Sequence, residues 1–199
     1  MTADSRVTLH MAASLDGFVA RKDGSVDWLE TADDFADGKT MDAEAVEGFL
    51  HGIDCYVMGS RTYETALCFE AKGLGWAYGD KPTFVLAHRQ LPRIRDAVEL
   101  HAGDLTQFLN GLLRPRFRSI WVVGGGMVAA ECLRLGLIDE IRYSVIPVLI
   151  GDGIPFFGRL DRDISLHLTR ADAFKSGVVE LCYEIKGPRR PGPFLGSDR

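Results

Sequence analysis

The chain has 199 residues, and 23 lysines and arginines against 28 aspartates and glutamates give it a formal net charge of −5. This length predicts one domain that needs no metal or disulfide staple, since a chain of about this size buries roughly 70% of its unfolded surface. The mildly acidic balance argues against nucleic-acid binding, and no apolar run approaches the roughly 20 residues of a membrane-spanning helix.

The four cysteines are Cys55, Cys68, Cys132 and Cys182. None belongs to a Cys-x-x-Cys pair or stands at zinc-site spacing from another cysteine or histidine, so the sequence predicts no metal site. We expect small buried side chains in a reducing cytosol. The polar residues 1–5 do not resemble a secretory signal, which also favours the cytoplasm.

Apolar residues in the first half of the chain switch between strand spacing and helical spacing. Val7, Leu9 and Met11 alternate with small or polar residues, which is the period of a strand. Helical spacing begins behind Asp42, which we expect to be an N-cap. In chain order, the pattern predicts a strand at 7–11, a loop at 16–27, a helix ending near 53, a strand at 55–58, a short helix from 60 or 61 to 67, a loop at 74–81 and a strand at 83–87.

The second half of the chain continues this alternation and then changes it. An amphipathic helix is expected over 105–113, with Asp104 as its cap and Pro115 just beyond its end. The remaining pattern predicts a strand at 120–123, a helix after 124–126, a long strand at 141–150, and an antiparallel pair at 164–173 and 178–186.

Short apolar strands that alternate with helices predict an α/β fold with a mostly parallel sheet and helices on both faces. The last strands have no helix between them, so we expect antiparallel strands at the C-terminal edge. Residues 1–186 would form one domain. Residues 187–199 are dominated by glycine, proline and charge, and we expect a disordered or arm-like tail.

The sharpest local signal is Gly124-Gly125-Gly126, which joins an apolar strand to a helix. Glycines let a ligand approach the backbone, and the free N–H groups of a helix start favour an anion such as a pyrophosphate. The dinucleotide fingerprint G-x-G-x-x-G/A is matched only in part, because no acidic residue follows the next strand about 20 positions later. A tight turn without a ligand is the alternative interpretation.

Three other strand ends carry polar groups. The run Gly59 to Thr62 opens a helix with a guanidinium and two hydroxyls, and His88-Arg89 follows the next strand. If the strands are parallel, the run Gly59 to Thr62 and His88-Arg89 lie beside the glycine turn, at the edge where open α/β sheets bind ligands. For Arg61 alone, an exposed arginine near a helix end is the alternative. Ser14 and Asp16 follow the first strand, where they would bond the local backbone or hold a substrate hydroxyl.

These motifs occur in an order that matches a known family. Met11 to Ala20, Gly59 to Glu64, Val122 to Val128, Leu137 to Glu140 and Ile146 to Gly151 together resemble the dihydrofolate reductase-like superfamily. The branch it most resembles is the reductase (C-terminal) domain of the riboflavin-biosynthesis bifunctional deaminase-reductase, with its stand-alone relatives. The resemblance covers nearly all of the chain except the tail.

The resemblance implies a reductase that uses NADPH. In that family the positions of Arg61 and Arg89 would meet the 2′-phosphate that distinguishes NADPH from NADH. Family members commonly place arginine where this chain has Ser60, which leaves the preference for NADPH open. The positions implied in cofactor binding are Ala13, Val19, Gly59, Ser60, Arg61, Thr62, His88, Arg89, Gly124, Gly125, Gly126, Met127 and Val128.

The resemblance also implies a small heterocyclic substrate, either pterin-like or ribosylaminopyrimidine-like. Dihydrofolate reductase uses a carboxylate on its first active-site helix to help protonate the substrate, and the positions nearest to it by spacing from Trp28 are Asp33 and Asp34. The resemblance thus implies that one of them would relay a proton, and a solvated acidic loop is the alternative. Trp28, Ser14 and Asp16 would contact the substrate. We expect a homodimer, because relatives in this branch usually pair and the C-terminal strands offer an apolar surface.

Two other classes of function stay open. The first is a nucleotide-binding protein that retains the fold without turnover. The second is a flavin-binding or structural protein in which Phe69, Trp76 and Tyr78 stack on a ring.

Overall fold

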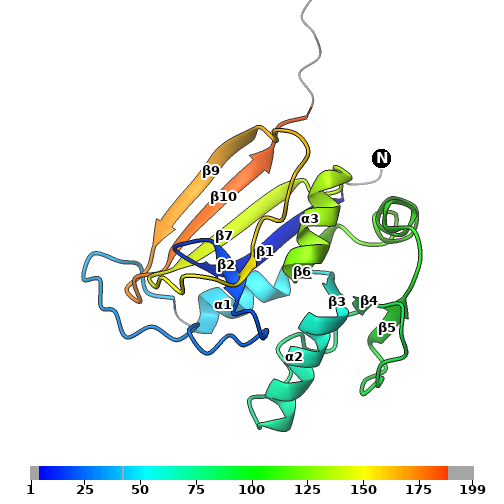
Figure 1. The fold of residues 1–199 in the computed structure, drawn as a ribbon, viewed down its shortest axis with the longest axis horizontal. Coiled ribbons are helices and arrows are strands. Elements are labelled where there is room, and N and C mark those ends of the chain that lie inside the picture. The colour runs from blue at the N-terminus through cyan, green and yellow to red at the C-terminus, as the bar shows by residue number, and fades with distance from the viewer. Residues whose placement is uncertain (1–4, 42, 188–199) are drawn as a thin grey trace, which may run out of the picture.

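The computed structural model describes residues 5–41 and 43–187, so Asp42, the expected N-cap, and 188–199 of the expected tail lie outside the described residues (Figure 1). An eight-stranded sheet has the order β5-β4-β3-β6-β1-β7-β10-β9, and β2 pairs with β8 in a second sheet. The strands are β1 (Arg6–Ser14), β2 (Phe18–Ala20), β3 (Cys55–Gly59), β4 (Thr83–Leu86), β5 (Val98–His101), β6 (Ser119–Gly124), β7 (Glu140–Ile146), β8 (Ile154–Pro155), β9 (Leu166–Ala173) and β10 (Val179–Ile185).

The strand directions confirm the predicted fold class. All neighbouring pairs from β5 to β7 are parallel, whereas β10 runs antiparallel to both β7 and β9. The order of the strands in the sheet differs from their order in the sequence, because β1 lies in the interior of the sheet between β6 and β7. Loops that leave β1, β3, β4, β6 and β7 at their carboxyl ends therefore meet at one edge of the sheet.

Helices cover both faces of the sheet, as predicted. The helices are α1 (Ala43–His51), α2 (Ser60–Ala71), the π-helix η1 (Gln107–Leu113) and α3 (Gly126–Arg134). Residues of η1 and α3 pack on Val7 and Leu9 in one core cluster. Tyr63 of α2 and Phe49 of α1 belong to a second cluster with Tyr56 of β3.

Part of the α1 side of the sheet carries charges, which we call the polar face (His10, Glu140, Arg142, Arg170, Asp172 and Glu180). Glu140, Asp172 and Glu180 are buried, with at most 9% of their surface exposed. Arg142 Nε lies 2.9 Å from Glu140 Oε1, and Arg170 Nε lies 3.0 Å from Asp172 Oδ2. The imidazole of His10 stacks on Trp121, with ring centroids 4.9 Å apart, and its Nε2 lies 3.0 Å from Ser144 Oγ. The buried carboxylates of the polar face are thus all paired, Asp172 also with Lys39 and Glu140 also with Arg6, whereas Nδ1 of His10 has no hydrogen-bond partner among the described residues.

The largest departures from the predicted elements have local causes. The strand expected over 141–150 ends at Ile146, because Pro147 has no N–H to continue the ladder. The helix expected over 105–113 is a π-helix, in which the N–H of Arg114 donates to the carbonyl of Leu109 at 2.9 Å. Its expected cap is confirmed, since the N–H of Gln107 donates to Asp104 Oδ1 at 2.6 Å.

Three short strands and one helix extension are additional to the predicted elements. β2 is an apolar run of only three residues inside the loop expected at 16–27, β8 has only two residues, and β5 buries only Val98 at the outer edge, so none gives a strand-length apolar pattern. Helix α2 extends to Ala71. The final antiparallel pair is confirmed within two residues at each end.

Candidate functional site

Two helices begin side by side at the carboxyl edge of the sheet. β3 ends at Gly59 and leads into α2, while its neighbour β6 ends at Gly124 and leads into α3. The N-cap residues are Gly59 and Gly125, and neither makes a side-chain cap hydrogen bond. The first N–H groups of both helices are therefore free of side-chain caps, and the positive ends of two helix dipoles lie at one edge.

The glycines allow these two turns to lie in contact. A Cβ on Gly59 would lie 3.0 Å from Val128 Cγ2, and one on Gly125 would lie 3.4 Å from Thr62 Oγ1. Gly124 has a φ of +112°, and a Cβ there would lie 2.3 Å from Met11 Sδ. The peptide bond between Gly124 and Gly125 is cis. The positive φ of Gly124 and its contact with Met11 are what require glycine at this turn.

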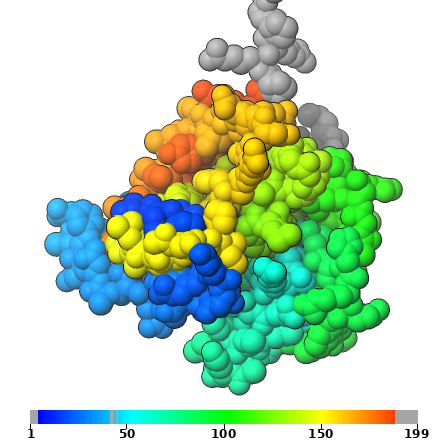
Figure 2. Space-filling view, in the orientation of Figure 1, coloured from blue at the N-terminus to red at the C-terminus, as the bar shows by residue number. Residues whose placement is uncertain are grey.

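The small second sheet packs directly on the start of α3. A Cβ on Gly126 would lie 2.4 Å from the carbonyl oxygen of Pro155 in β8, and one on Gly153 would lie 2.2 Å from the carbonyl oxygen of Ala20 in β2. Figure 2 shows the N-terminal segment in blue against the yellow segment that contains β8. This sheet forms one wall beside the glycine turn.

Ser14 and Asp16 bind the local backbone. Ser14 is fully buried, and its Oγ accepts a hydrogen bond from the N–H of Phe18 at 3.1 Å. The Asp16 carboxylate accepts from the N–H groups of Ile150 at 3.2 Å and Gly151 at 2.7 Å. The hydrogen bond from Ser14, followed by these backbone bonds, lowers the pKa of Asp16. The two side chains thus join the loop after β1 to the loop after β7, and their contact with substrate stays a prediction.

The predicted phosphate-binding side chains gather beside these turns. Gly59 of β3 pairs with Leu86 of β4, so the chain segments that follow these residues leave the same edge. Arg61 is exposed on the first turn of α2, and His88 and Arg89 are exposed in the loop after β4. Nη2 of Arg89 lies 2.6 Å from Glu64 Oε1. Glu64 is a site-edge residue that the sequence analysis did not select, although it ends the Gly59 to Glu64 motif.

The other predicted cofactor positions differ in their exposure. Ala13 is fully buried in the core, and Val19 is partly buried against it. Met127 is 78% exposed at the start of α3, whereas Val128 packs on the core. Met127 thus presents an apolar side chain beside the uncapped helix start.

A cavity of about 540 Å³ lies at the carboxyl end of β7. Trp28 is 6% exposed, and its buried indole Nε1 has no hydrogen-bond partner among the described residues. Asp33 and Asp34 are both exposed, but only Asp33 belongs to the lining of the cavity. The N–H of Leu15 donates to the carbonyl of Val148 at 2.8 Å, which connects the cavity to the end of β1. The lining residues are Trp28, Glu30, Thr31, Ala32, Asp33, Ile146, Pro147 and Val148.

The acidic segment that contains Asp33 is anchored by its backbone. The N–H of Phe35 donates to the carbonyl of Lys175 at 2.7 Å, and the N–H of Lys39 donates to the carbonyl of Ala173 at 2.8 Å. A Cβ on Gly177 would lie 2.1 Å from Asp33 Oδ2, so the carboxylate lies against the turn between β9 and β10. The acidic side chains are exposed, but the segment is fixed along this turn.

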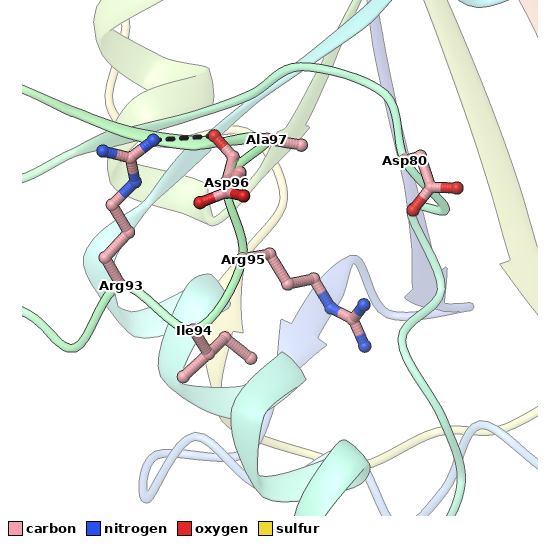
Figure 3. Close-up of a pocket in the computed structure, with 6 residues that line it drawn as sticks. All are labelled: Asp80, Arg93, Ile94, Arg95, Asp96 and Ala97. Atoms are coloured by element: carbon pink, nitrogen blue, oxygen red, sulfur yellow. Dashed lines mark hydrogen bonds between the residues drawn. The ribbon is translucent and has the colours of Figure 1, made fainter.

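A second cavity, of about 620 Å³, lies at the opposite edge of the sheet, beside the amino ends of β4 and β5 (Figure 3). Arg95 points into it, and its guanidinium lies over Trp76 at 5.6 Å. Trp76 and Tyr78 contact each other with ring centroids 4.9 Å apart. Two of the three aromatic residues of the flavin alternative, Trp76 and Tyr78, therefore pack on each other. The lining residues are Asp80, Arg93, Ile94, Arg95, Asp96 and Ala97.

The cysteines, metal-binding groups and helices provide three further observations. Cys55, Cys132 and Cys182 are buried as predicted, but Cys68 is exposed, because Tyr63 and Ala66 define the buried side of α2. Within residues 5–41 and 43–187, no three His, Cys, Asp or Glu side chains gather as a metal site. Among the same residues, no helix is long and apolar enough to cross a membrane.

Comparison with solved structures defines the class of fold. A protein from Shewanella sp. PV-4, named for riboflavin biosynthesis, is 27% identical with a TM-score of 0.76, covering 92% of this chain and 99% of that one. Dihydrofolate reductase from Enterococcus faecalis, solved with NADP(H), is 15% identical with a TM-score of 0.56, covering 92% and 97%. The predicted dihydrofolate reductase-like fold is confirmed.

Sequence comparison then defines the family. Residues 5–180 match the family described as the RibD C-terminal domain. The uncharacterized protein YyaP of Bacillus subtilis is 29% identical over 191 residues, which cover 92% of this chain and 96% of YyaP. The chain belongs to the family of RibD C-terminal domains, and this membership and fold indicate a reductase-type protein.

Proposed function

We propose that the protein is an NADPH-dependent reductase that transfers hydride to a small heterocyclic substrate. The observation that carries this proposal is the pair of adjoining helix starts at Gly59 and Gly125, whose N–H groups have no side-chain cap. Two helix starts at one edge suit a pyrophosphate, which carries charge on both phosphates. Gly59 and Gly124 let the two turns pack closely on Val128 and Met11, which brings the uncapped N–H groups together, and in this respect the residues present fit such a group.

The chain's own residues would divide the work of holding the cofactor. Backbone N–H groups at Ser60 and Gly126 would bind the pyrophosphate, with the hydroxyl of Thr62 beside them. Arg61 and Arg89 would bind the phosphate of the adenosine ribose, since guanidinium groups donate two hydrogen bonds to one phosphate. NADPH, when bound, supplies the hydride.

The cavity beside Trp28 would hold the substrate. The buried indole N–H of Trp28 is a donor without a partner among the described residues, and the carboxylate of Asp33 is an acceptor in the same lining. A lactam edge of a pterin or a pyrimidinone carries a carbonyl acceptor next to an N–H donor and matches this pair. Asp33 would also relay a proton to the reduced ring. Asp34, outside the lining, is the weaker of the two predicted acids.

The proposal includes a homodimer in the cytoplasm with no nucleic-acid or membrane partner. β9 is the outer strand of the sheet and exposes Leu166 and Leu168, at 36% and 49%. An open strand edge with apolar residues favours pairing with another chain. Calibrated size-exclusion chromatography would return a dimer mass, and a monomer mass would contradict this part.

Titration with NADPH and NADH tests the proposal. Binding would quench the fluorescence of the three tryptophans and raise that of the nicotinamide. We expect both signals with NADPH, followed by NADPH consumption when pterins and ribosylaminopyrimidines are screened. Binding without consumption across the screen would favour the nucleotide-binding alternative. No binding of either cofactor would refute the reductase.

A further inference from the structure

The ion pair between Glu64 and Arg89 lies within the proposed cofactor site. Glu64 is on the first turns of α2, and Arg89 is in the loop after the neighbouring strand β4. Arg89 Nη2 and Glu64 Oε1 are 2.6 Å apart, with 55% and 43% of the two side chains exposed. The cation expected to meet a ribose phosphate therefore already has a carboxylate partner, and both side chains face solvent.

The carboxylate changes what this edge attracts. Glu64 neutralises the charge of Arg89 and repels a phosphate dianion that approaches the same guanidinium. A carboxylate beside an adenosine ribose also accepts a hydrogen bond from a free 2′-hydroxyl. Ser60 adds no positive charge, so Arg61 is the remaining arginine on this turn, and the described residues give it no ion-pair partner.

We propose that Glu64 determines cofactor selectivity: by holding Arg89, it weakens binding of a 2′-phosphate and lets the site accept NADH as well as NADPH. This inference rests on the proposed function and adds a specificity-determining residue to it. Glu64 acts here on the cofactor's ribose and its phosphate, not on the hydride acceptor.

The same helix supplies a matched control. Glu70 pairs with Arg95 near the end of α2, with 29% and 36% of their side chains exposed. Arg95 lines the cavity at the opposite edge of the sheet (Figure 3). Glu70→Gln therefore removes a similar charge and breaks a similar pair on α2 without touching the proposed cofactor site.

Calorimetric titration of the full chain with two cofactor fragments tests the proposal. Adenosine 2′,5′-bisphosphate carries the 2′-phosphate, and adenosine 5′-monophosphate carries a free hydroxyl. In Glu64→Gln we expect affinity for the bisphosphate to rise about 3- to 10-fold at low salt. The gain should shrink in about 0.5 M sodium chloride, because exposed charges are screened. Affinity for the monophosphate should stay equal or fall, and Glu70→Gln should match the wild type with both fragments.

The outcomes separate this proposal from the proposed function. If the wild type binds both fragments and Glu64→Gln binds the bisphosphate no better, Glu64 does not set selectivity, although the nucleotide site stands. If Arg89→Gln leaves bisphosphate affinity unchanged, the pair is not at the 2′-phosphate and the proposal also fails. If the wild type binds neither fragment, the nucleotide site itself is absent and both proposals fall. Equal circular dichroism spectra would show that each variant folds.

Discussion

The carboxyl edge of the sheet and the polar face use polar groups in opposite ways. At the edge, the groups on offer are backbone N–H donors of α2 and α3, brought together by glycines and left without side-chain caps. On the polar face, charged side chains pair with one another, as Arg142 does with Glu140 and Arg170 with Asp172. The helix starts at the edge keep backbone donors available to a ligand, whereas each buried carboxylate of the polar face is paired with an arginine. Uncapped backbone donors that glycines bring to one place indicate an anion site more specifically than a cluster of paired charges does.

The largest expected effect concerns the glycine at the start of α3. In Gly126→Ala, the new Cβ would meet the Pro155 carbonyl at 2.4 Å. We expect the free energy of unfolding to fall by about 3 kcal/mol, which is the upper end of the range for overpacking, and NADPH binding to be lost. Urea denaturation measures the change. Gly48→Ala in α1 is the control, since nothing lies within 4 Å of its Cβ, and it should be as stable as the wild type or more so.

The polar face should respond to pH. Burial lowers the pKa of His10 from 6.5 to about 4, against the opposing pull of Glu180. The unfolded chain therefore takes up a proton first, so stability is complete above pH 6.5 and falls as the pH drops towards 4. Protonation of His10 should lower the free energy of unfolding by about 3 kcal/mol between pH 6.5 and pH 4. His10→Phe should show a flatter pH dependence in urea denaturation, and an equally steep profile would contradict the assignment. His167→Gln, at an exposed position of β9, should follow the wild type.

A smaller effect is expected beneath the edge. The hydroxyl of the buried Tyr63 donates to the carbonyl of Pro92 at 2.7 Å and holds the loop after β4 against α2. Tyr63→Phe should lower the free energy of unfolding by about 1 kcal/mol, because one buried hydrogen bond is lost. Thermal denaturation measures this change. Tyr183→Phe is the control, since the described residues give that hydroxyl no hydrogen-bond partner, and a comparable loss there would show a general effect of removing a hydroxyl.

The smallest effect on stability separates binding from folding. Arg61 is exposed, so Arg61→Gln should change the free energy of unfolding by less than about 0.5 kcal/mol. Affinity for NADPH should nevertheless fall, because one charge-assisted contact to phosphate is lost. Fluorescence titration of the nicotinamide measures it. Unchanged affinity would remove Arg61 from the site.

The sequence alone predicts the parts of this architecture that have strong local patterns. β3 is buried at every residue and β6 has an apolar run, so both strands and the glycine turns behind them are predictable. β5 and β8 are not, since an edge strand that buries one residue and a strand of two residues leave no pattern. The cavity between Trp28 and Val148 also escapes prediction, because it requires β1 and β7 to be neighbours. The Glu64–Arg89 pair depends likewise on β3 lying beside β4.

The position of β1 has a consequence for how the chain is made. Val7 pairs with Ile120 of β6, and Thr8 pairs with Glu140 of β7. Both neighbours of β1 in the sheet are thus translated long after it. During synthesis β1 therefore lacks its native partners at a stage when β3 and β4 can already pair. Such long-range contacts slow folding and leave an apolar strand accessible to other chains. Nascent chains stalled before β6 should therefore depend on chaperones more than complete ones.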